Sequence, residues 1–371
     1  MNRINVLQFI SPTGLYGAER WILALANNIN TNKVKCNLAV TKESDKQHLD
    51  IIQLYPSGAG ETFVLNMLGR FDFKVINKLC GTIRKHDIKI IHTHGYKSDL
   101  LGLFAAKLTG IKAISTPHGF GENNDFKLNL YIKLGTYFLK FFDKIVPLSR
   151  QLTDAVLQKG VTTAKVVYIQ NGVDFSEIEY WRNLPSIKHP NRLKTIGYIG
   201  QMIPRKNLKD LLDTFDTIWH KHPLTRLVLI GDGCDRHSLE VYAKSLESNN
   251  HIHFLGYQDN RLEHLHSFDL FVMTSSYEGI PRCMMEAMAM GIPVTAYRIP
   301  GIDQLVIHEK TGLLSPVGDS DNLASNCEIL LSDKPYADNI ASAGRSHILA
   351  HYSAKRMADE YTALYETTLN E

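Results

Sequence analysis

The strongest constraint on the fold of this chain is a regular alternation of short apolar runs with longer amphipathic segments. In the first half, the runs with strand character are residues 5–9, 35–40, 88–92, 113–115, 144–147 and 166–169. The polar segment 177–191 interrupts this pattern, which restarts with residues 195–199, 226–230, 252–254, 270–273 and 294–296. Strands separated by helices are typical of parallel sheets. The sequence therefore predicts an α/β protein built from two doubly wound, Rossmann-like domains.

The expected domain boundaries follow from that interruption. We expect one domain at residues 1–175, a second at 176–352, and a final helical segment at 353–371. A chain of 371 residues is long enough for two separate cores. Two doubly wound domains that face each other leave a cleft beyond the carboxyl ends of their strands, where ligands bind.

Cysteine and histidine usage argues against a metal or cofactor site. The five cysteines are scattered and form no Cys-x-x-Cys pair, so neither a disulfide framework nor a thiolate zinc site is predicted. The His-x-His pairs at residues 92/94, 251/253 and 264/266 lack a third ligand at a suitable spacing. The one Asp-x-Asp, at residues 319–321, stands at an expected helix start and is interpreted as capping acids. We therefore expect neither a bound metal nor a cofactor.

The two halves of the chain differ in charge. Residues 1–175 carry 22 Lys and Arg against 13 Asp and Glu, whereas residues 176–371 carry 19 against 25. A basic half suggests an anionic partner, and because no aromatic-plus-arginine signature of a nucleic-acid module accompanies it, a membrane surface or lipid phosphate is favoured over nucleic acid. The segment 126–146 has the pattern of a basic amphipathic helix that contacts membranes, although a helix packed on the core would look the same.

Localisation follows from the lack of apolar segments. The run at residues 4–10 meets a turn and resembles a strand, not a signal peptide, and no stretch approaches the roughly 20 apolar residues of a bilayer crossing. We expect a cytoplasmic protein, peripheral at the inner face of the membrane.

The most informative local segment joins a loop to a predicted helix over residues 282–290. It places Glu278 on the loop and Glu286 on the helix, with Gly279, Ile280 and Pro281 between loop and helix. The free amides and the dipole of a helix start bind anions, and the two carboxylates can accept hydrogen bonds from sugar hydroxyls. An acidic loop before an ordinary surface helix would explain the same two glutamates.

Other candidate residues follow predicted strands. Gly14, Tyr16 and Gly17 lie in a loop after the first strand, and His94 and His118 follow two later strands. Gly200 leads to the cations Arg205 and Lys206. The remaining candidates after strands of the second half are Gly231 and Tyr257. Each of these features alone is also explained by an ordinary turn, capping group or solvated charge.

Taken together, these motifs resemble the retaining glycosyltransferases of family 4, which have the GT-B fold. The resemblance is closest over residues 195–315. It implies that Glu278 contacts the donor sugar, Glu286 contacts the nucleotide ribose, and the amides between them face the diphosphate. It also implies that residues 353–371 cross back to the N-terminal, acceptor-binding domain, whereas residues 176–352 bind the donor.

The same resemblance gives roles to the remaining candidates. Lys206 is implied to contact the diphosphate. Gln201 replaces the arginine that the family usually carries after Gly200, so Arg205 is the candidate to supply the missing charge. Gly14, Gly17, Gly200, Gly231 and Tyr257 are implied on the donor side, and Tyr16, His94 and His118 on the acceptor side, with His118 also at the reaction centre.

The predicted activity is transfer of a hexose, with retention and without a metal, from a nucleotide diphosphate sugar, most commonly UDP in this family. The acceptor is expected to be a saccharide or a lipid-linked saccharide of cell-envelope polysaccharide or glycolipid synthesis. Two alternatives remain open. A nucleotide-sugar epimerase of the same fold would use the same donor site without an acceptor, and a non-catalytic sugar- or nucleotide-binding protein would have a similar architecture.

Overall fold

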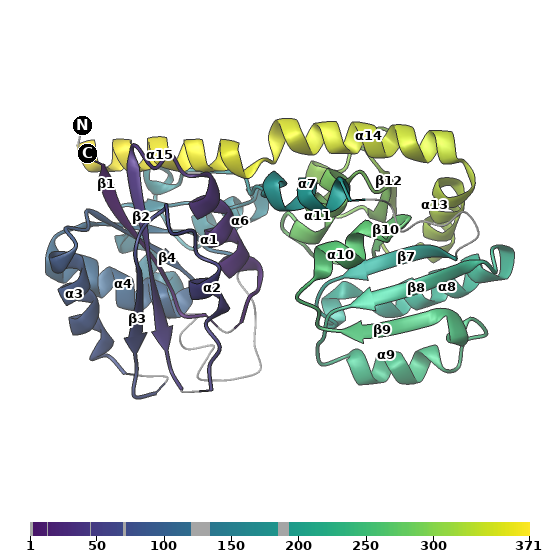
Figure 1. The fold of residues 1–371 in the computed structure, drawn as a ribbon, viewed down its shortest axis with the longest axis horizontal. Helices are drawn as coiled ribbons and strands as arrows, with labels where there is room; N and C mark the ends of the chain where they lie inside the picture. The colour runs from purple at the N-terminus through teal and green to yellow at the C-terminus, as the bar shows by residue number, and fades with distance from the viewer. Residues whose placement is uncertain (1–2, 13, 45, 70–71, 120–133, 185–192) are drawn as a thin grey trace. The chain divides into compact units, whose positions relative to one another are not determined.

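The computed structural model describes residues 3–12, 14–44, 46–69, 72–119, 134–184 and 193–371. The chain divides into two compact units (Figure 1). Unit 1 consists of residues 1–174 together with 353–371, and unit 2 of residues 175–352.

Unit 1 is built on a six-stranded sheet in the order β3-β2-β1-β4-β5-β6, in which every pair of neighbours is parallel. Its strands are β1 (Ile4–Ile10), β2 (Val34–Lys42), β3 (Thr62–Asn66), β4 (Ile90–His94), β5 (Lys112–Ser115) and β6 (Lys144–Ile145). The helices of its described residues are α1 (Gly17–Asn28), α2 (Asp50–Gln53), α3 (Val75–Lys85), α4 (Tyr96–Thr109), α6 (Arg150–Gln158) and α15 (Ala354–Asn370).

The central strands β1 and β2 are buried on both faces, which explains why β1 is almost continuously apolar. Successive side chains of a strand point to opposite faces. Accordingly, Val6 and Ile10 of β1 belong to a core shared with α1 and α15, while Leu7 and Phe9 belong to a second core shared with α3 and α4. The C-terminal helix α15 thus covers one face of unit 1, as Figure 1 shows.

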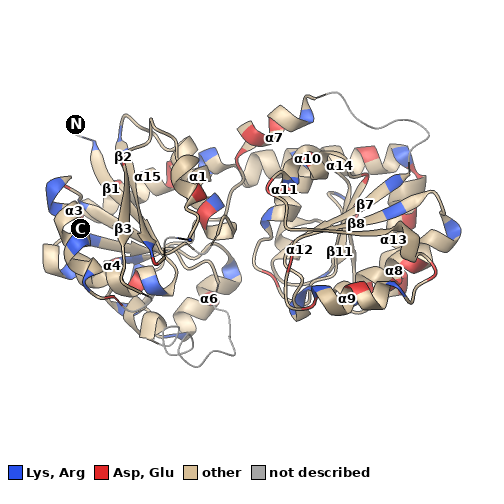
Figure 2. Cartoon of the chain, turned by 60° about the horizontal axis from the view of Figure 1, so that its bottom comes forward, with Lys and Arg blue, Asp and Glu red and all other residues tan. Residues whose placement is uncertain are grey.

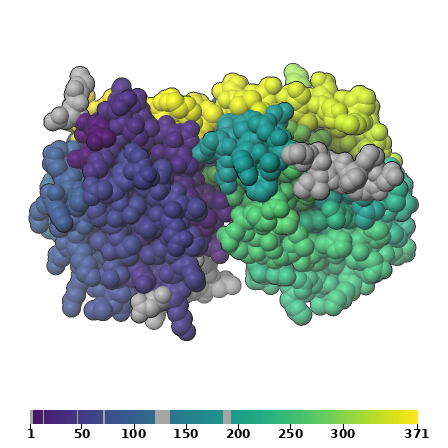
Figure 3. All heavy atoms as spheres, in the orientation of Figure 1, coloured from purple at the N-terminus to yellow at the C-terminus, as the bar shows by residue number. Residues whose placement is uncertain are grey.

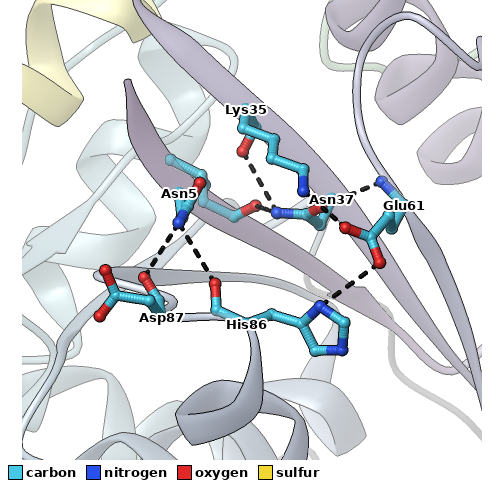
Figure 4. A network of polar contacts seen from close by, with 7 residues as sticks. Asn5, Lys35, Asn37, Glu61, His86 and Asp87 are labelled. Atoms are coloured by element: carbon cyan, nitrogen blue, oxygen red, sulfur yellow. Dashed lines mark hydrogen bonds and ion pairs between the residues drawn. The ribbon is translucent and has the colours of Figure 1, made fainter. Parts of the chain in front are cut away.

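A polar network joins elements of unit 1 near the beginnings of the strands (Figure 4). Asn37 on β2 donates to the carbonyl oxygen of Val6 at 3.3 Å and accepts from the amide of Glu61 at 3.0 Å. The Glu61 carboxylate contacts Lys35 at 2.5 Å and His86 at 3.4 Å. These contacts link β1, β2, the start of β3 and the end of α3, so we assign this network a structural role.

Unit 2 repeats the architecture with a sheet in the order β12-β11-β10-β7-β8-β9, again parallel throughout. Its strands are β7 (Lys194–Ile199), β8 (Thr225–Ile230), β9 (Ile252–Gly256), β10 (Leu270–Met273), β11 (Val294–Tyr297) and β12 (Leu313–Ser315). Its helices are α7 (Phe175–Arg182), α8 (Leu208–Lys221), α9 (Arg236–Ala243), α10 (Arg261–His266), α11 (Arg282–Met290), α12 (Ile302–Leu305), α13 (Ser320–Ser332) and α14 (Lys334–His351).

In each unit the strand order reverses at its first strand. β1 lies between β2 and β4, and β7 lies between β8 and β10. In each unit, the loops that follow the two adjacent strands at this reversal therefore lead in opposite directions. Ligands of open α/β sheets bind at such a switch point. The strands to search for a site are β1 and β4 in unit 1, and β7 and β10 in unit 2.

The α/β class with two doubly wound sheets is confirmed. The helix predicted at residues 282–290 has those bounds in α11, and Asp319 caps α13 by accepting from the amide of Asn322 at 3.0 Å. The strand predicted at residues 166–169 is wrong, because only Val166 forms an isolated bridge there. The strands β3 and β12 were not expected.

The polar segment between the domains was predicted as an interruption, but its first part forms α7. This helix lies on the surface of unit 2, with Tyr180 63% exposed (Figure 3). Residues 185–191 of the predicted segment lie outside the described residues.

Lys and Arg residues lie on several helices of unit 1, including α3 (Figure 2). Within the described part of the chain, no helix is both long and apolar enough to cross a membrane.

Gly231 is the glycine that the geometry of unit 2 most requires. It follows β8 with φ +133°, and a Cβ there would overlap the carbonyl oxygen of Gly200. We expect Gly231→Ala to lower the free energy of unfolding by at least about 3 kcal/mol, because backbone strain and steric overlap add. Gly318→Ala is the matched control: Gly318 has φ +80° with no atom near its Cβ position, so its cost should be about 1–2 kcal/mol. Equal losses in urea unfolding would refute the steric argument.

Candidate active site

The central feature of unit 2 is a buried ion pair at the switch point of its sheet. Lys206 ends the short 3-10 helix Pro204–Lys206 after β7, and Glu278 lies in the loop after the neighbouring strand β10. The Nζ atom of Lys206 contacts Oε1 of Glu278, and both side chains are more than nine-tenths buried. Two residues 72 positions apart in the sequence therefore meet where a ligand of this fold would bind.

Arg205 joins this pair from the partly exposed side. Its Nη1 atom lies 3.1 Å from Oε1 of Glu278 and donates to the carbonyl oxygen of Tyr277 at 3.0 Å. The two loops are also joined through their backbones, since the amide of Ser276 donates to the Arg205 carbonyl at 2.9 Å. The structure thus holds two cations on one carboxylate, a cluster with one net positive charge.

The amino end of α11 lies directly after this cluster. Pro281 is the N-cap residue, and the amide of Met285 donates to its carbonyl oxygen at 3.1 Å. The amides of the first helical turn before Met285 therefore have no partner within the helix. Gly301, at φ +96°, permits its backbone to press against the carbonyl of Gly279 and so supports the loop. Ile280 is 9% exposed and contributes by packing.

Cys283 in the first turn of α11 remains a thiol. Burial raises its pKa to about 12, although the nearby Lys206 acts in the opposite direction. A thiol with this pKa is not a thiolate nucleophile at neutral pH.

Glu286 on α11 is held by two arginines. Nε and Nη2 of Arg261 donate to its two oxygens at 3.1 and 2.7 Å, and Nε of Arg282 donates to Oε1 at 2.8 Å. Burial raises the pKa of Glu286, but the two guanidinium groups outweigh it and lower the pKa to about 2. Glu286 is therefore a buried carboxylate with three donors, and contact with a ribose would use its remaining acceptor capacity.

The remaining unit 2 candidates line the same edge of the sheet. The amide of Gly200 donates to Ile230 at 2.9 Å, and the amide of Gly231 donates to Gly256 at 2.8 Å, so the loops after β7, β8 and β9 lie in close succession. Tyr257 follows β9 and is 46% exposed. Gln201, which stands where a second cation was expected, is exposed.

In unit 1, the loop after β1 leads into α1. The backbone amide of Tyr16 donates to the carboxylate of Glu19 at 3.1 Å, and the Tyr16 side chain is 48% exposed. A Cβ at Gly14 would crowd the ring of Tyr16, whereas Gly17 has open space around its Cβ position. Because the exposed Tyr16 ring can turn aside, neither position has a strict steric need for glycine.

A second polar cluster of unit 1 contains the predicted histidines. Nδ1 of His94 lies 3.1 Å from Nε2 of His118, and Nε2 of His94 lies 2.8 Å from Oε1 of Gln8 on β1. His92 contacts the hydroxyls of Tyr365 and Thr116, both at 2.8 Å. Burial lowers the pKa of His92 to about 3 and that of His118 to about 4, so both rings are neutral at physiological pH.

Several residues of these clusters were not predicted from the sequence. Trp21 packs its ring 5.1 Å from His94 and 5.6 Å from His118. Gln8, Arg261 and Arg282 complete the contacts described above. A Gln within an otherwise apolar strand could have been recognised in the sequence as a candidate, whereas Arg261 and Arg282 resembled surface charges. No group of three His, Cys, Asp or Glu suited to a metal ion occurs among the residues that the structure describes.

Comparisons with known proteins agree with this architecture. A family model described as "Glycosyltransferase Family 4" matches residues 16–177, and "Glycosyl transferases group 1" matches residues 180–347. The chain is 24% identical over 311 residues to the N-acetyl-alpha-D-glucosaminyl L-malate synthase of Bacillus anthracis, covering 81% of this chain and 80% of that protein. It is 25% identical over 312 residues to an Escherichia coli UDP-Gal:alpha-D-GlcNAc-diphosphoundecaprenol alpha-1,3-galactosyltransferase, covering 79% of each.

Solved structures match the whole fold at lower identity. A glycosyltransferase from Rickettsia africae superimposes with a TM-score of 0.81 at 18% identity and covers 100% of both chains. HepE from Anabaena, solved in complex with UDP, gives a TM-score of 0.79 at 19% identity, covering 98% of this chain and 100% of that one. The two family models together span nearly the entire sequence, and this chain belongs to glycosyltransferase family 4, with the GT-B fold.

Proposed function

We propose that this glycosyltransferase moves a hexose from a UDP-sugar to a saccharide or lipid-linked acceptor with retention of configuration, in cell-envelope polysaccharide or glycolipid synthesis. The E. coli relative is named for a UDP-galactose donor and a diphosphoundecaprenol acceptor, and another relative is the capsular polysaccharide glycosyltransferase CapM of Staphylococcus aureus. HepE is also solved with UDP-glucose. These names support the donor and acceptor classes.

The observation that carries the proposal is the convergence of Lys206 and Arg205 on Glu278 at the switch point, beside the start of α11. A leaving nucleoside diphosphate gains negative charge as its bond to the sugar breaks, and catalysis requires positive potential where that charge develops. One charge pair at 4 Å is worth about 4 kcal/mol at an effective dielectric of 20, and a helix start adds about 0.3–1 kcal/mol.

In this mechanism each residue has a separate role. Lys206 and Arg205 bind the diphosphate together with the free amides of α11. Glu278 keeps the two cations in place and accepts hydrogen bonds from the sugar. Tyr257 faces the base and Glu286 the ribose, while His118 contacts the reacting sugar or the acceptor hydroxyl.

Retention would proceed by attack on the same face of the sugar from which the diphosphate leaves, with the leaving phosphate taking the acceptor proton. Glu278 is unsuited to act as a covalent nucleophile, because its Oε1 already contacts two cations and its side chain is nine-tenths buried. The proposal therefore assigns it to binding.

The function is tested with a panel of nucleotide sugars, by measuring nucleotide diphosphate release with and without candidate acceptors. A transferase releases the diphosphate in an acceptor-dependent manner, whereas an epimerase alters the donor or releases the sugar without an acceptor. A binding protein would release nothing.

Glu278→Gln tests the site itself. We expect kcat/KM to fall at least about 100-fold, because the carboxylate that positions two cations is lost. No covalent glycosyl-enzyme should appear in intact-protein mass spectra of the wild type or the variant. Glu247→Gln is the control, since Glu247 is an exposed glutamate of the same unit whose side chain is 76% exposed. A trapped adduct on Glu278 would overturn the binding role.

We further propose that protein cations replace a divalent metal. The wild-type enzyme should keep its full rate in excess EDTA, because Lys206, Arg205 and the α11 amides neutralise the leaving diphosphate. Loss of activity in EDTA that manganese restores would contradict this assignment.

Peripheral binding to an anionic membrane is proposed for one surface of unit 1. Exposed rings of α4 and residues 134–141 are grouped there: Phe104 contacts Phe138, which contacts Tyr137 and Phe141 in turn. Phe104, Tyr137 and Phe141 are exposed. Lys140 lies over the ring of Tyr137, with its Nζ 5.3 Å from the centroid. The predicted helix at residues 126–146 falls partly outside the described residues, and its described part combines apolar rings with basic groups. Such a surface suits anionic headgroups.

This surface is tested by co-sedimentation with vesicles. Wild-type protein should bind phosphatidylglycerol vesicles at low salt and release at high salt. The double variant Tyr137→Ser, Phe141→Ser should lose most of this binding. Leu224→Ser in unit 2, where Leu224 is 73% exposed, should bind as the wild type does. Unchanged binding of the double variant would remove this surface from the proposal.

A further inference from the structure

The side-chain amide of Gln8 has a single orientation that satisfies all of its neighbours. Gln8 lies on β1 and is completely buried. Its Nε2 donates to the hydroxyl oxygen of Tyr365 at 3.0 Å and to the sulfur of Cys36 at 3.5 Å, which uses both amide hydrogens. Burial raises the pKa of Cys36 to about 11, so its sulfur stays neutral. The amide oxygen is left to face His94, and the reverse orientation would leave one amide hydrogen without an acceptor.

This orientation determines which nitrogen of His94 carries the proton. Oε1 of Gln8 only accepts, so Nε2 of His94, at 2.8 Å, must donate. In a neutral imidazole the other nitrogen is then an acceptor. Nδ1 of His94 therefore accepts from Nε2 of His118 at 3.1 Å.

The proton position of His118 is fixed by this contact with His94. With its proton on Nε2, a neutral His118 carries a lone pair on Nδ1. No hydrogen-bond partner of that nitrogen occurs among the described residues. His118 is only partly buried, in contrast to His92 and His94.

The surroundings keep the three rings neutral. His94 contacts Gln8 of β1, Trp21 of α1 and His92 of β4, and His118 contacts His94 and Trp21. Tyr361 and Tyr365 of α15 contact Trp21 and His92. Within the described residues, no carboxylate is hydrogen-bonded to His94 or His118. The chain of hydrogen bonds thus carries no charge, and its direction is set by Gln8.

We infer that Gln8 and His94 are positioning residues that hold His118 in the Nε2-protonated tautomer, so that its Nδ1 accepts a hydrogen bond from a hydroxyl of the bound substrate. Only the identity of that substrate rests on the proposed function. The tautomer is a property of the protein without ligand.

The first experiment is nitrogen-15 NMR of histidine-labelled, ligand-free protein at neutral pH. The His118 signals are identified by their loss in His118→Asn. The expected result is a protonated Nε2 and an unprotonated Nδ1 on His118. A protonated Nδ1 would overturn the inference, whatever the enzyme's activity.

The second experiment removes the positioning contact while keeping a side chain of similar length. In Gln8→Met the His118 signals should show a mixture of tautomers, and kcat should fall on the order of tenfold, which is the loss of about one hydrogen bond. The dissociation constant for UDP should stay unchanged, because Lys206, Tyr257 and Glu286, to which the proposed function assigns the nucleotide, belong to unit 2. A tenfold loss of kcat without any tautomer change would contradict the positioning role.

A matched pair of variants on α15 separates positioning from general stability. Tyr365→Phe removes the hydroxyl that accepts from Gln8, whereas Tyr361→Phe removes a hydroxyl that contacts Thr116, 2.9 Å away. Both tyrosines are fully buried. We expect the tautomer mixture and the lower kcat in Tyr365→Phe only. Equal effects in both variants would sink the inference, whereas an inactive wild type with the expected tautomer would refute only the proposed function.

Discussion

Parallel hydrogen bonding in the two sheets is the constraint on which the rest of the structure depends. A parallel strand needs a long crossover before the next one, so every strand ends at the same edge and every loop that leaves it is available for chemistry. The reversal of strand order beside β1 and β7 then opens that edge at one place in each unit. The clusters around Glu278 and around His94 both lie at such a place, which explains why residues distant in sequence meet there.

A buried charge at these places costs free energy and is tolerated only where side chains of opposite charge contact it. Removing an ion from water costs several kcal/mol, and a partner in good geometry offsets this cost. Lys206 with Glu278, and Glu286 with Arg261 and Arg282, meet that condition. Each cluster is already ordered before a ligand arrives, so little reorganisation is needed to bind an anion. His92, His94 and His118 follow a different rule, since burial lowers their pKa and keeps the rings neutral.

Much of the architecture was accessible from the sequence because strand and helix periodicities are local signals. The alternation predicted both sheets, and the Gly-x-Pro pattern predicted the start of α11. β3 has mostly exposed or half-exposed residues and β12 has only three, so neither produced a clear apolar run. Val166 to Ile169 had the composition of a strand but found a partner at one residue only. Composition does not tell which edge remains available for pairing.

The candidate site was predictable in its residues but not in its contacts. Lys206, Arg205 and Glu278 were each named from motifs, yet nothing in their spacing tells that all three meet. Arg261 reaches Glu286 through tertiary packing of α10 against α11, which a single sequence does not encode in a readable pattern. Arg282 stands four residues before Glu286 on α11, a spacing from which their contact could have been predicted. Gln8 acquires its importance only from partners 28 to 357 positions away.

The return of α15 to unit 1 has a consequence for how the chain matures. Tyr361 and Tyr365 of this helix supply ring surface and hydroxyls to a core whose members outside α15 all precede residue 175. During synthesis this helix leaves the ribosome after all of unit 2. The first lobe to be translated is therefore the last to be completed, and until then the part of its apolar core that α15 covers stays exposed to solvent.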